Sequence, residues 1–109
     1  MDDRDRALIL DIKRRLSSDL DCHVKRLIVF GSRAKGGAAE DSDLDVIALV
    51  DEKNPEIEKG LEDIAYQIMW DHDFRPIISL KVLSEAQFYN ALNRGFSFYR
   101  HVEKEGVSV

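Results

Sequence analysis

Two short groups of residues in this sequence could act together on a phosphorylated ligand. Gly31 and Ser32 follow the apolar run 24–30, and Asp43 and Asp45 stand at the start of a second apolar run. A strand that enters Gly-Ser and a short helix presents backbone N–H groups and a hydroxyl at a helix N-terminus, where a phosphate is stabilised. Taken alone, a strand followed by Gly-Ser is more often an ordinary turn than a binding site.

The acidic pair adds a metal to this interpretation. Asp43 and Asp45 alternate with Leu44, so in a strand their carboxylates leave the same face and can share a cation. Carboxylate oxygens suit Mg²⁺, which keeps several waters and takes its remaining ligands from substrate phosphates. Many Asp-x-Asp pairs are inert, but here the pair follows the Gly-Ser turn after ten residues. The combination predicts a site for a metal-bound nucleoside triphosphate.

The residues after the turn exclude a P-loop. That loop requires a second glycine followed by Lys and Ser or Thr, whereas Gly36 precedes Gly37 and Ala38. The motif instead resembles that of the DNA polymerase beta superfamily of nucleotidyltransferases, specifically its minimal nucleotidyltransferase (MNT) group. The matching residues are Gly31, Ser32 and Arg33, then Ser42, Asp43, Leu44, Asp45 and Val46. The resemblance extends more loosely over almost the whole chain, including its last residues, 98–109.

The resemblance implies a nucleotidyltransferase fold and a role for each matching residue. In that family Gly-Ser holds triphosphate oxygens and the two acids hold magnesium. We therefore expect nucleotide binding by Gly31, Ser32, Arg33 and Ser42, and catalysis and Mg²⁺ binding by Asp43 and Asp45. Arg33 is expected to support either the phosphates or the turn itself.

The sequence does not visibly supply a third carboxylate. Active members of the superfamily carry one on the following central strand, where it completes a two-metal site. Here that strand offers Ile78 or Ser79 at the corresponding place. Asp71, His72 and Asp73 lie just upstream, but they fall in a predicted loop, which is a poorer place for a well-positioned ligand. The missing acid weakens the case for catalysis more than the case for nucleotide binding.

The resemblance implies a partner as well as a substrate. MNT proteins commonly pair with HEPN-domain proteins as antitoxin and toxin, and some of them adenylylate a tyrosine of that partner. The first hypothesis is therefore an enzyme that transfers AMP from ATP, or from another nucleoside triphosphate, to a hydroxyl of such a partner. The second is a catalytically impaired nucleotide-binding module that neutralises a partner toxin by complex formation. A drug-modifying nucleotidyltransferase is the third, disfavoured because 109 residues leave no room for a substrate domain.

The elements that must position these residues follow from hydrophobic periodicity and from turn residues. Helices are predicted at 3–20, from Asn54-Pro55 onward, from the capping box at Ser84 to near Gly95, and at 96–105. Strands are predicted at 24–30, 44–50 and 77–83. This order predicts an α/β (α+β) domain, a small mixed sheet with helices packed on it.

Length and charge set the remaining expectations. A chain of 109 residues is expected to form a single nucleotidyltransferase domain, 1–109. Its net charge of −5 disfavours direct binding of long nucleic acid. No apolar run approaches the length of a membrane span, so we expect a cytoplasmic protein with no membrane contact. The sequence leaves homo-oligomerisation open.

Two further features complete the expectations. Cys22 is the sole cysteine, which excludes an intrachain disulfide, and we expect its thiol to be buried or half-buried. Five aromatic residues gather near the C-terminus, more than one small core can bury, so part of this group is a candidate protein interface. They are Phe88, Tyr89, Phe96, Phe98 and Tyr99.

Overall fold

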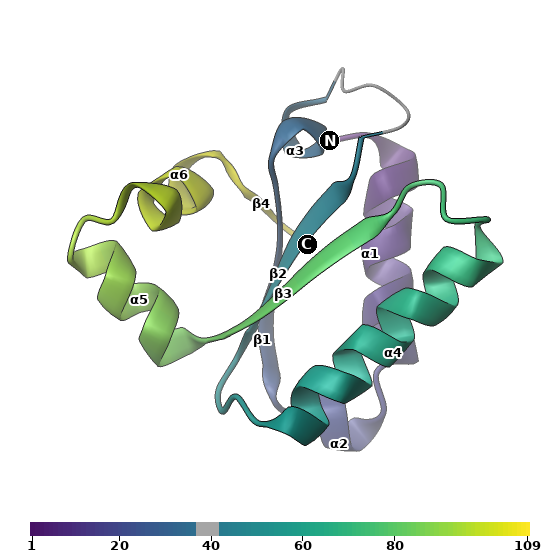
Figure 1. The fold of residues 1–109 in the computed structure, drawn as a ribbon, viewed down its shortest axis with the longest axis horizontal. Helices are drawn as coiled ribbons and strands as arrows, with labels where there is room; N and C mark the ends of the chain where they lie inside the picture. The colour runs from purple at the N-terminus through teal and green to yellow at the C-terminus, as the bar shows by residue number, and fades with distance from the viewer. Residues whose placement is uncertain (37–41) are drawn as a thin grey trace.

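The computed structural model describes residues 1–36 and 42–109, which fold around a four-stranded sheet of order β3-β2-β1-β4 (Figure 1). The strands are β1 (Val24–Phe30), β2 (Leu44–Val50), β3 (Ile78–Ser84) and β4 (Val107–Ser108). The helices are α1 (Asp3–Arg15), α2 (Ser18–Asp21), α3 (Ser32–Lys35), α4 (Pro55–Asp71), α5 (Glu85–Asn93) and α6 (Ser97–Glu105). Since β2 pairs antiparallel with β1 and parallel with β3, the predicted mixed sheet with packed helices is confirmed.

Helices cover both faces of the sheet. The pair α1 and α4 lies on one face, and α5 and α6 lie on the other (Figure 1). Central strand β2 sends Leu44 and Val46 into the first core and Ile47 and Leu49 into the second. Because successive side chains of a strand alternate between its faces, Asp45 lies on the side of α5 and α6. It is the one residue of β2 that is not fully buried.

The strands and most helix starts confirm the predictions, but the helix predicted at 3–20 is wrong. It ends at Arg15, and a separate helix α2 begins after Ser17. The hydroxyl of Ser17 accepts a hydrogen bond from Leu20 N–H at 3.3 Å, which favours a new N-terminus over continuation. Leu16 and Leu20 still pack against the core that α1 covers. The predicted apolar positions were therefore correct, although they belong to two helices and the segment between them and not to one continuous helix.

Two predicted helix caps are confirmed. Asn54 Oδ1 accepts a hydrogen bond from Ile57 N–H at 2.9 Å at the start of α4. Ser84 Oγ accepts one from Gln87 N–H at 3.1 Å at the start of α5. Each of these caps satisfies an amide that has no partner inside its own helix.

Strand β4 is an element that the sequence did not predict. It pairs antiparallel with β1, Val107 opposite Val29 and Ser108 opposite Ile28. The guanidinium of Arg26 on β1 donates to Ser108 Oγ at 2.7 Å and also contacts Tyr89 and Glu103. Two residues are too short to show a strand pattern, so these long-range contacts are what define β4.

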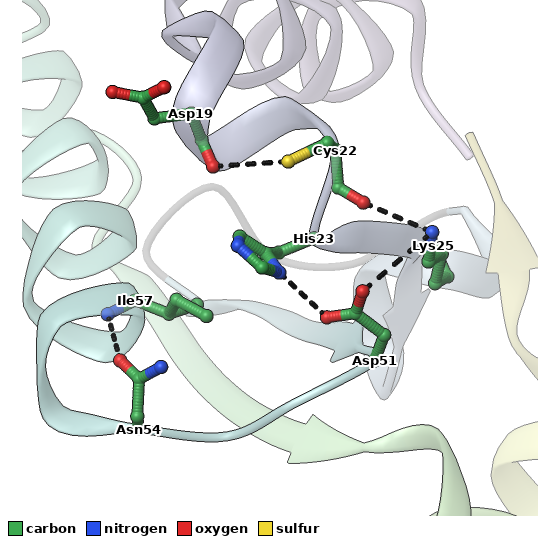
Figure 2. Close-up of polar contacts among 7 residues, drawn as sticks. All are labelled: Asp19, Cys22, His23, Lys25, Asp51, Asn54 and Ile57. Atoms are coloured by element: carbon green, nitrogen blue, oxygen red, sulfur yellow. Dashed lines mark hydrogen bonds and ion pairs between the residues drawn. The ribbon is translucent and has the colours of Figure 1, made fainter.

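At the far end of the sheet from Asp45, β1 begins beside the end of β2. Figure 2 shows the polar contacts there: His23 Nδ1 lies 2.9 Å from Asp51 Oδ1, and Lys25 Nζ donates to Cys22 O at 3.0 Å. Cys22 is exposed in the turn after α2, with its thiol donating to Asp19 O at 3.3 Å. The expectation of a buried or half-buried thiol was therefore wrong, because the turn runs over the surface.

The aromatic side chains divide between core and surface as predicted. Phe88 is fully buried between α5 and the sheet, whereas Phe96 is 49% and Phe98 39% exposed. On α4, Tyr66 and Trp70 are also largely exposed. Among the described residues, no helix combines the length and the apolar character needed to cross a bilayer.

A buried ion pair fixes the turn after β1. Asp5 of α1 is 2% exposed and accepts two hydrogen bonds at 3.0 Å from the guanidinium of Arg33, on α3. The same guanidinium donates to the carbonyl of Ser42 at 2.8 Å. One side chain thus joins the first helix, the turn after β1 and the approach to β2.

We predict that Asp5→Ala lowers the free energy of unfolding by about 3–5 kcal/mol, because it removes the buried carboxylate that accepts two hydrogen bonds from Arg33. Urea unfolding followed by circular dichroism measures this change. Arg14→Ala is the matched control, since Arg14 is paired with Asp11 but its side chain is 78% exposed. An exposed pair of this kind is worth about 0–1 kcal/mol. Equal urea midpoints for the two variants would contradict the proposed importance of the buried pair.

Candidate functional site

The pairing of β1 with β2 brings Gly31 and Asp45 into contact. Phe30 is the register partner of Asp45, so the next residue, Gly31, turns away directly beside the carboxylate. A Cβ atom at Gly31 would lie 2.6 Å from Asp45 Oδ2, closer than such atoms approach one another. Gly31 also has a φ of +78°, a conformation that favours glycine. The predicted turn and one acid of the pair are therefore one packed unit.

The turn leads into α3 as predicted. Gly31 precedes the helix and supplies no side-chain cap to its first turn. Ser32 follows Gly31 as the first residue of α3, and its side chain is exposed. A hydroxyl and backbone amides at this position are groups that can donate hydrogen bonds to a phosphate oxygen.

The two acids differ in their exposure. Asp43 is exposed before β2, whereas Asp45 is half-buried within it. Burial and the nearby negative charge of Asp43 raise the pKa of the Asp45 carboxyl, and Lys81 opposes this by attraction. Within the part of the chain that the structure describes, neither carboxylate accepts a hydrogen bond or forms an ion pair at contact distance. The site thus holds two like charges whose repulsion a bound cation would relieve.

This donor set fits a divalent cation that is shared with a ligand. Among the described residues, no group of three or more His, Cys, Asp or Glu side chains is arranged to hold a metal. Asp43 and Asp45 would therefore provide two protein ligands, and the remaining ligands would come from water and phosphate oxygens. That is the usual pattern for Mg²⁺ bound with a nucleotide.

The contacts of Arg33 support the turn. The guanidinium is tied to Asp5 and to the carbonyl of Ser42, and it lies within 3.5 Å of the Ser42 hydroxyl. Of the two roles expected for Arg33, these contacts favour support of the turn over direct phosphate binding. Ser42 likewise contributes to the geometry of the segment that delivers Asp43. Residues 37–41, which include Gly37 and Ala38, lie between Arg33 and Ser42 and are outside the described residues.

Strand β3 carries no acid beside the pair. Ser79 is the register partner of Asp45, while Ile78 points into the core under α1 and α4. Of the two positions left open by the sequence, Ser79 is therefore the one on the face of Asp45. Upstream, Asp71 ends α4 and its carboxylate is paired with Arg15 at 2.7 Å. His72 and Asp73 lie in the turn before β3, away from its register with Asp45.

Two residues near the site were missed from the sequence. Asp5 occupies the apolar stripe of α1, three residues before Leu8, and an acid on a buried helix face signals a buried partner. Nothing in the sequence around Lys81 indicates that it lies near the site, because only the parallel pairing of β3 with β2 brings it near Asp45.

We predict that Gly31→Ala destabilises the protein more than Gly95→Ala does. Both glycines have positive φ, a backbone conformation that costs an alanine about 1–3 kcal/mol, but only at Gly31 would the methyl group collide with Asp45. A Cβ at Gly95 has no atom within 4 Å. Urea unfolding measures the stability of the two variants. Equal losses of stability would contradict the prediction, because they would show that the Asp45 side chain moves aside without an energetic cost.

We predict that Asp45→Asn raises stability at neutral pH while weakening Mn²⁺ binding. The folded-state pKa of Asp45 lies above its ordinary value of 3.8, so its ionisation opposes folding. That destabilisation is fully present above the folded pKa and disappears as pH falls to the ordinary value. The gain from Asp45→Asn should therefore be largest at neutral pH and vanish near pH 3, in thermal unfolding without metal. A gain that is independent of pH would contradict this assignment.

Comparison with known proteins agrees with this geometry. Residues 9–105 match the family described as the nucleotidyltransferase domain. A protein of Methanocaldococcus jannaschii named "putative protein adenylyltransferase" is 34% identical over 105 residues, covering 94% of this chain and 95% of the relative. The match includes the turn, the acidic pair and all the elements from β1 to α6. The chain therefore belongs to the nucleotidyltransferase domain family and is a transferase of that type.

Proposed function

We propose that this chain transfers AMP from Mg²⁺-bound ATP to a tyrosine hydroxyl of a HEPN-domain partner, as the antitoxin of a toxin–antitoxin pair in the cytoplasm. The observation that carries the proposal is the pair of neighbouring carboxylates, Asp43 and Asp45, which have no hydrogen-bond partner among the described residues, with Asp45 packed against the turn at Gly31. The family match supplies the reaction class. The name of the M. jannaschii relative supports a protein as the acceptor.

Each residue of the site has a part in this proposal. Asp43 and Asp45 would hold the Mg²⁺, which neutralises phosphate charge when it is bound. Ser32 and the backbone that follows Gly31 would bind triphosphate oxygens. Arg33 and Ser42 would keep the turn and the acidic pair at a fixed separation. These groups position and neutralise the nucleotide, which is most of what phosphoryl and nucleotidyl transfer require of a protein.

The reaction itself is a substitution at the α-phosphorus. The acceptor hydroxyl oxygen forms a bond to that phosphorus, and the bond from the phosphorus to the bridging oxygen of the β-phosphate breaks. Pyrophosphate leaves with the bonding electron pair, and the hydroxyl proton passes to solvent. The product is an AMP ester of the acceptor.

Exposed aromatic residues support a protein acceptor. Phe98 is 39% exposed on α6 and its ring lies 5.6 Å from that of Phe30, the register partner of Asp45. Phe96 is exposed just before α6. Large aromatic side chains beside a site are typical of protein interfaces. A partner docked on α6 would therefore lie next to the acidic pair.

The experiment incubates the chain with α-³²P-ATP, Mg²⁺ and the HEPN-domain product of the neighbouring open reading frame. We expect label on the partner, and loss of at least about a hundredfold of that label when Asp43→Asn and Asp45→Asn are combined, because the metal then has no protein ligand. Electrophoresis with autoradiography measures transfer, and mass spectrometry identifies the modified residue.

The control removes the same charge elsewhere. Glu62→Gln with Asp63→Asn alters two acids of α4 that point to solvent, and transfer should be unchanged. A stable complex that carries no label would instead favour the alternative, a nucleotide-binding module that neutralises its partner by contact. The missing acid at Ser79 is the observation that keeps this alternative open.

A further inference from the structure

Lys81 lies on the same face of the sheet as Asp45. Strand β3 sends Ile78 and Val82 into the core under α1 and α4, so the alternate residues Ser79 and Lys81 lie on the opposite face. Ser79 is the register partner of Asp45, and Lys81 follows two residues later, opposite Ile47. The Lys81 side chain is exposed.

Phe98 holds the lysine ammonium on this face. Its ring centroid lies 5.3 Å from Lys81 Nζ and 5.6 Å from the ring of Phe30. Phe30 belongs to β1 and Lys81 to β3, the two strands that flank Asp45 on β2. One aromatic ring of α6 therefore reaches across the central strand and contacts a neighbour of Asp45 on each side. The cation–π contact restricts a side chain that otherwise would move freely in solvent.

The charge of Lys81 is available to a ligand. Lys81 attracts the Asp45 carboxylate, but among the described residues it forms no ion pair at contact distance. The surface lysines Lys35, Lys53 and Lys59, by comparison, are all within 4.0 Å of an acid. Lys81 thus brings a positive charge beside the acidic pair without neutralising either acid by direct contact.

The charges of the site can be compared with those of a two-metal centre. Two divalent cations with three carboxylates leave one positive charge to meet the triphosphate. One divalent cation with Asp43, Asp45 and Lys81 leaves the same single positive charge. The single positive charge of Lys81 could therefore replace the combined charge of the third acid and the second metal ion.

We propose that Lys81, positioned by Phe98, binds a phosphate of the nucleotide and that the site accordingly works with one divalent cation instead of two. This inference rests on the proposed nucleotide site at Asp43 and Asp45. Lys81 would supply a fixed positive charge beside the two acids that would hold the metal. Ser79, the register partner of Asp45, is small and uncharged and adds no third carboxylate there.

The test counts metal ions and measures nucleotide affinity, without requiring turnover. α,β-Methylene-ATP is titrated into the protein by calorimetry with Mn²⁺ present, and electron paramagnetic resonance counts the bound Mn²⁺. We expect one Mn²⁺ per bound nucleotide in the wild-type protein. Lys81→Met should weaken nucleotide binding by at least about tenfold, since a charge-assisted contact is lost while the packing on Phe98 is kept. Lys81→Arg should bind as the wild-type protein does.

Two further variants sharpen the result. Lys59→Met removes an equal charge from a side chain that is 79% exposed on α4, and it should leave affinity unchanged. Ser79→Asp combined with Lys81→Met places a carboxylate in register with Asp45, and it should bind a second Mn²⁺.

The outcomes separate the two proposals. Two Mn²⁺ per nucleotide in the wild-type protein, or equal affinities of Lys81→Met and Lys59→Met, would overturn the role of Lys81 and leave the proposed function standing. A wild-type protein that binds no α,β-methylene-ATP in the presence of Mn²⁺ would overturn the proposed function itself, and the role of Lys81 with it.

Discussion

The pair of Asp5 with Arg33 is the interaction on which the site depends. A bidentate contact between a carboxylate and a guanidinium fixes both distance and orientation, and here it is almost completely removed from water. Because Arg33 also binds the carbonyl of Ser42, the turn after β1 and the segment before β2 are held to the same helix. Breaking a buried ion pair by removing one partner is strongly destabilising, so the contact between Asp5 and Arg33 is one that the fold depends on.

The second constraint is the alternation of side chains along β2. Every apolar residue of β2 is buried in one of the two cores. The register of β2 with its neighbours is therefore fixed, because a shift of one residue would move each side chain to the opposite face of the sheet. Asp45 is the exception near the start of the strand, on the side of α5 and α6. Its position beside Phe30 and Ser79 thus follows from the packing of Val46 and Ile47. Hydrophobic burial, which has no directional preference of its own, here determines where a carboxylate points.

The site is built at a cost to stability. Asp45 is half-buried beside another acid, and Gly31 adopts a positive φ so that the turn can pass within contact of that carboxylate. Repulsion between the like charges raises the free energy of the folded chain without ligand, and the positive φ at Gly31 is unfavourable for most residues. Clusters of this kind are typical of functional sites, where a ligand supplies the missing charge. Phe98 and Lys81 add an aromatic contact and a cation on the same face, drawn from two other elements.

The sequence by itself determined the family, and with it the class of reaction, and most of the elements. Gly31, Ser32 and the two acids were recognisable because their spacing is typical of nucleotidyltransferases, and β1, β2 and α4 were evident from local periodicity. Only the tertiary structure decided that Ser79 faces Asp45, that Lys81 and Phe98 lie beside it, that Asp5 holds Arg33, and that residues 107–108 form a strand. These features depend on pairing and packing between segments far apart in the chain. Local propensity and spacing carry no information about which segment becomes the neighbour of another, so the partners of a residue emerge only when the sheet is assembled.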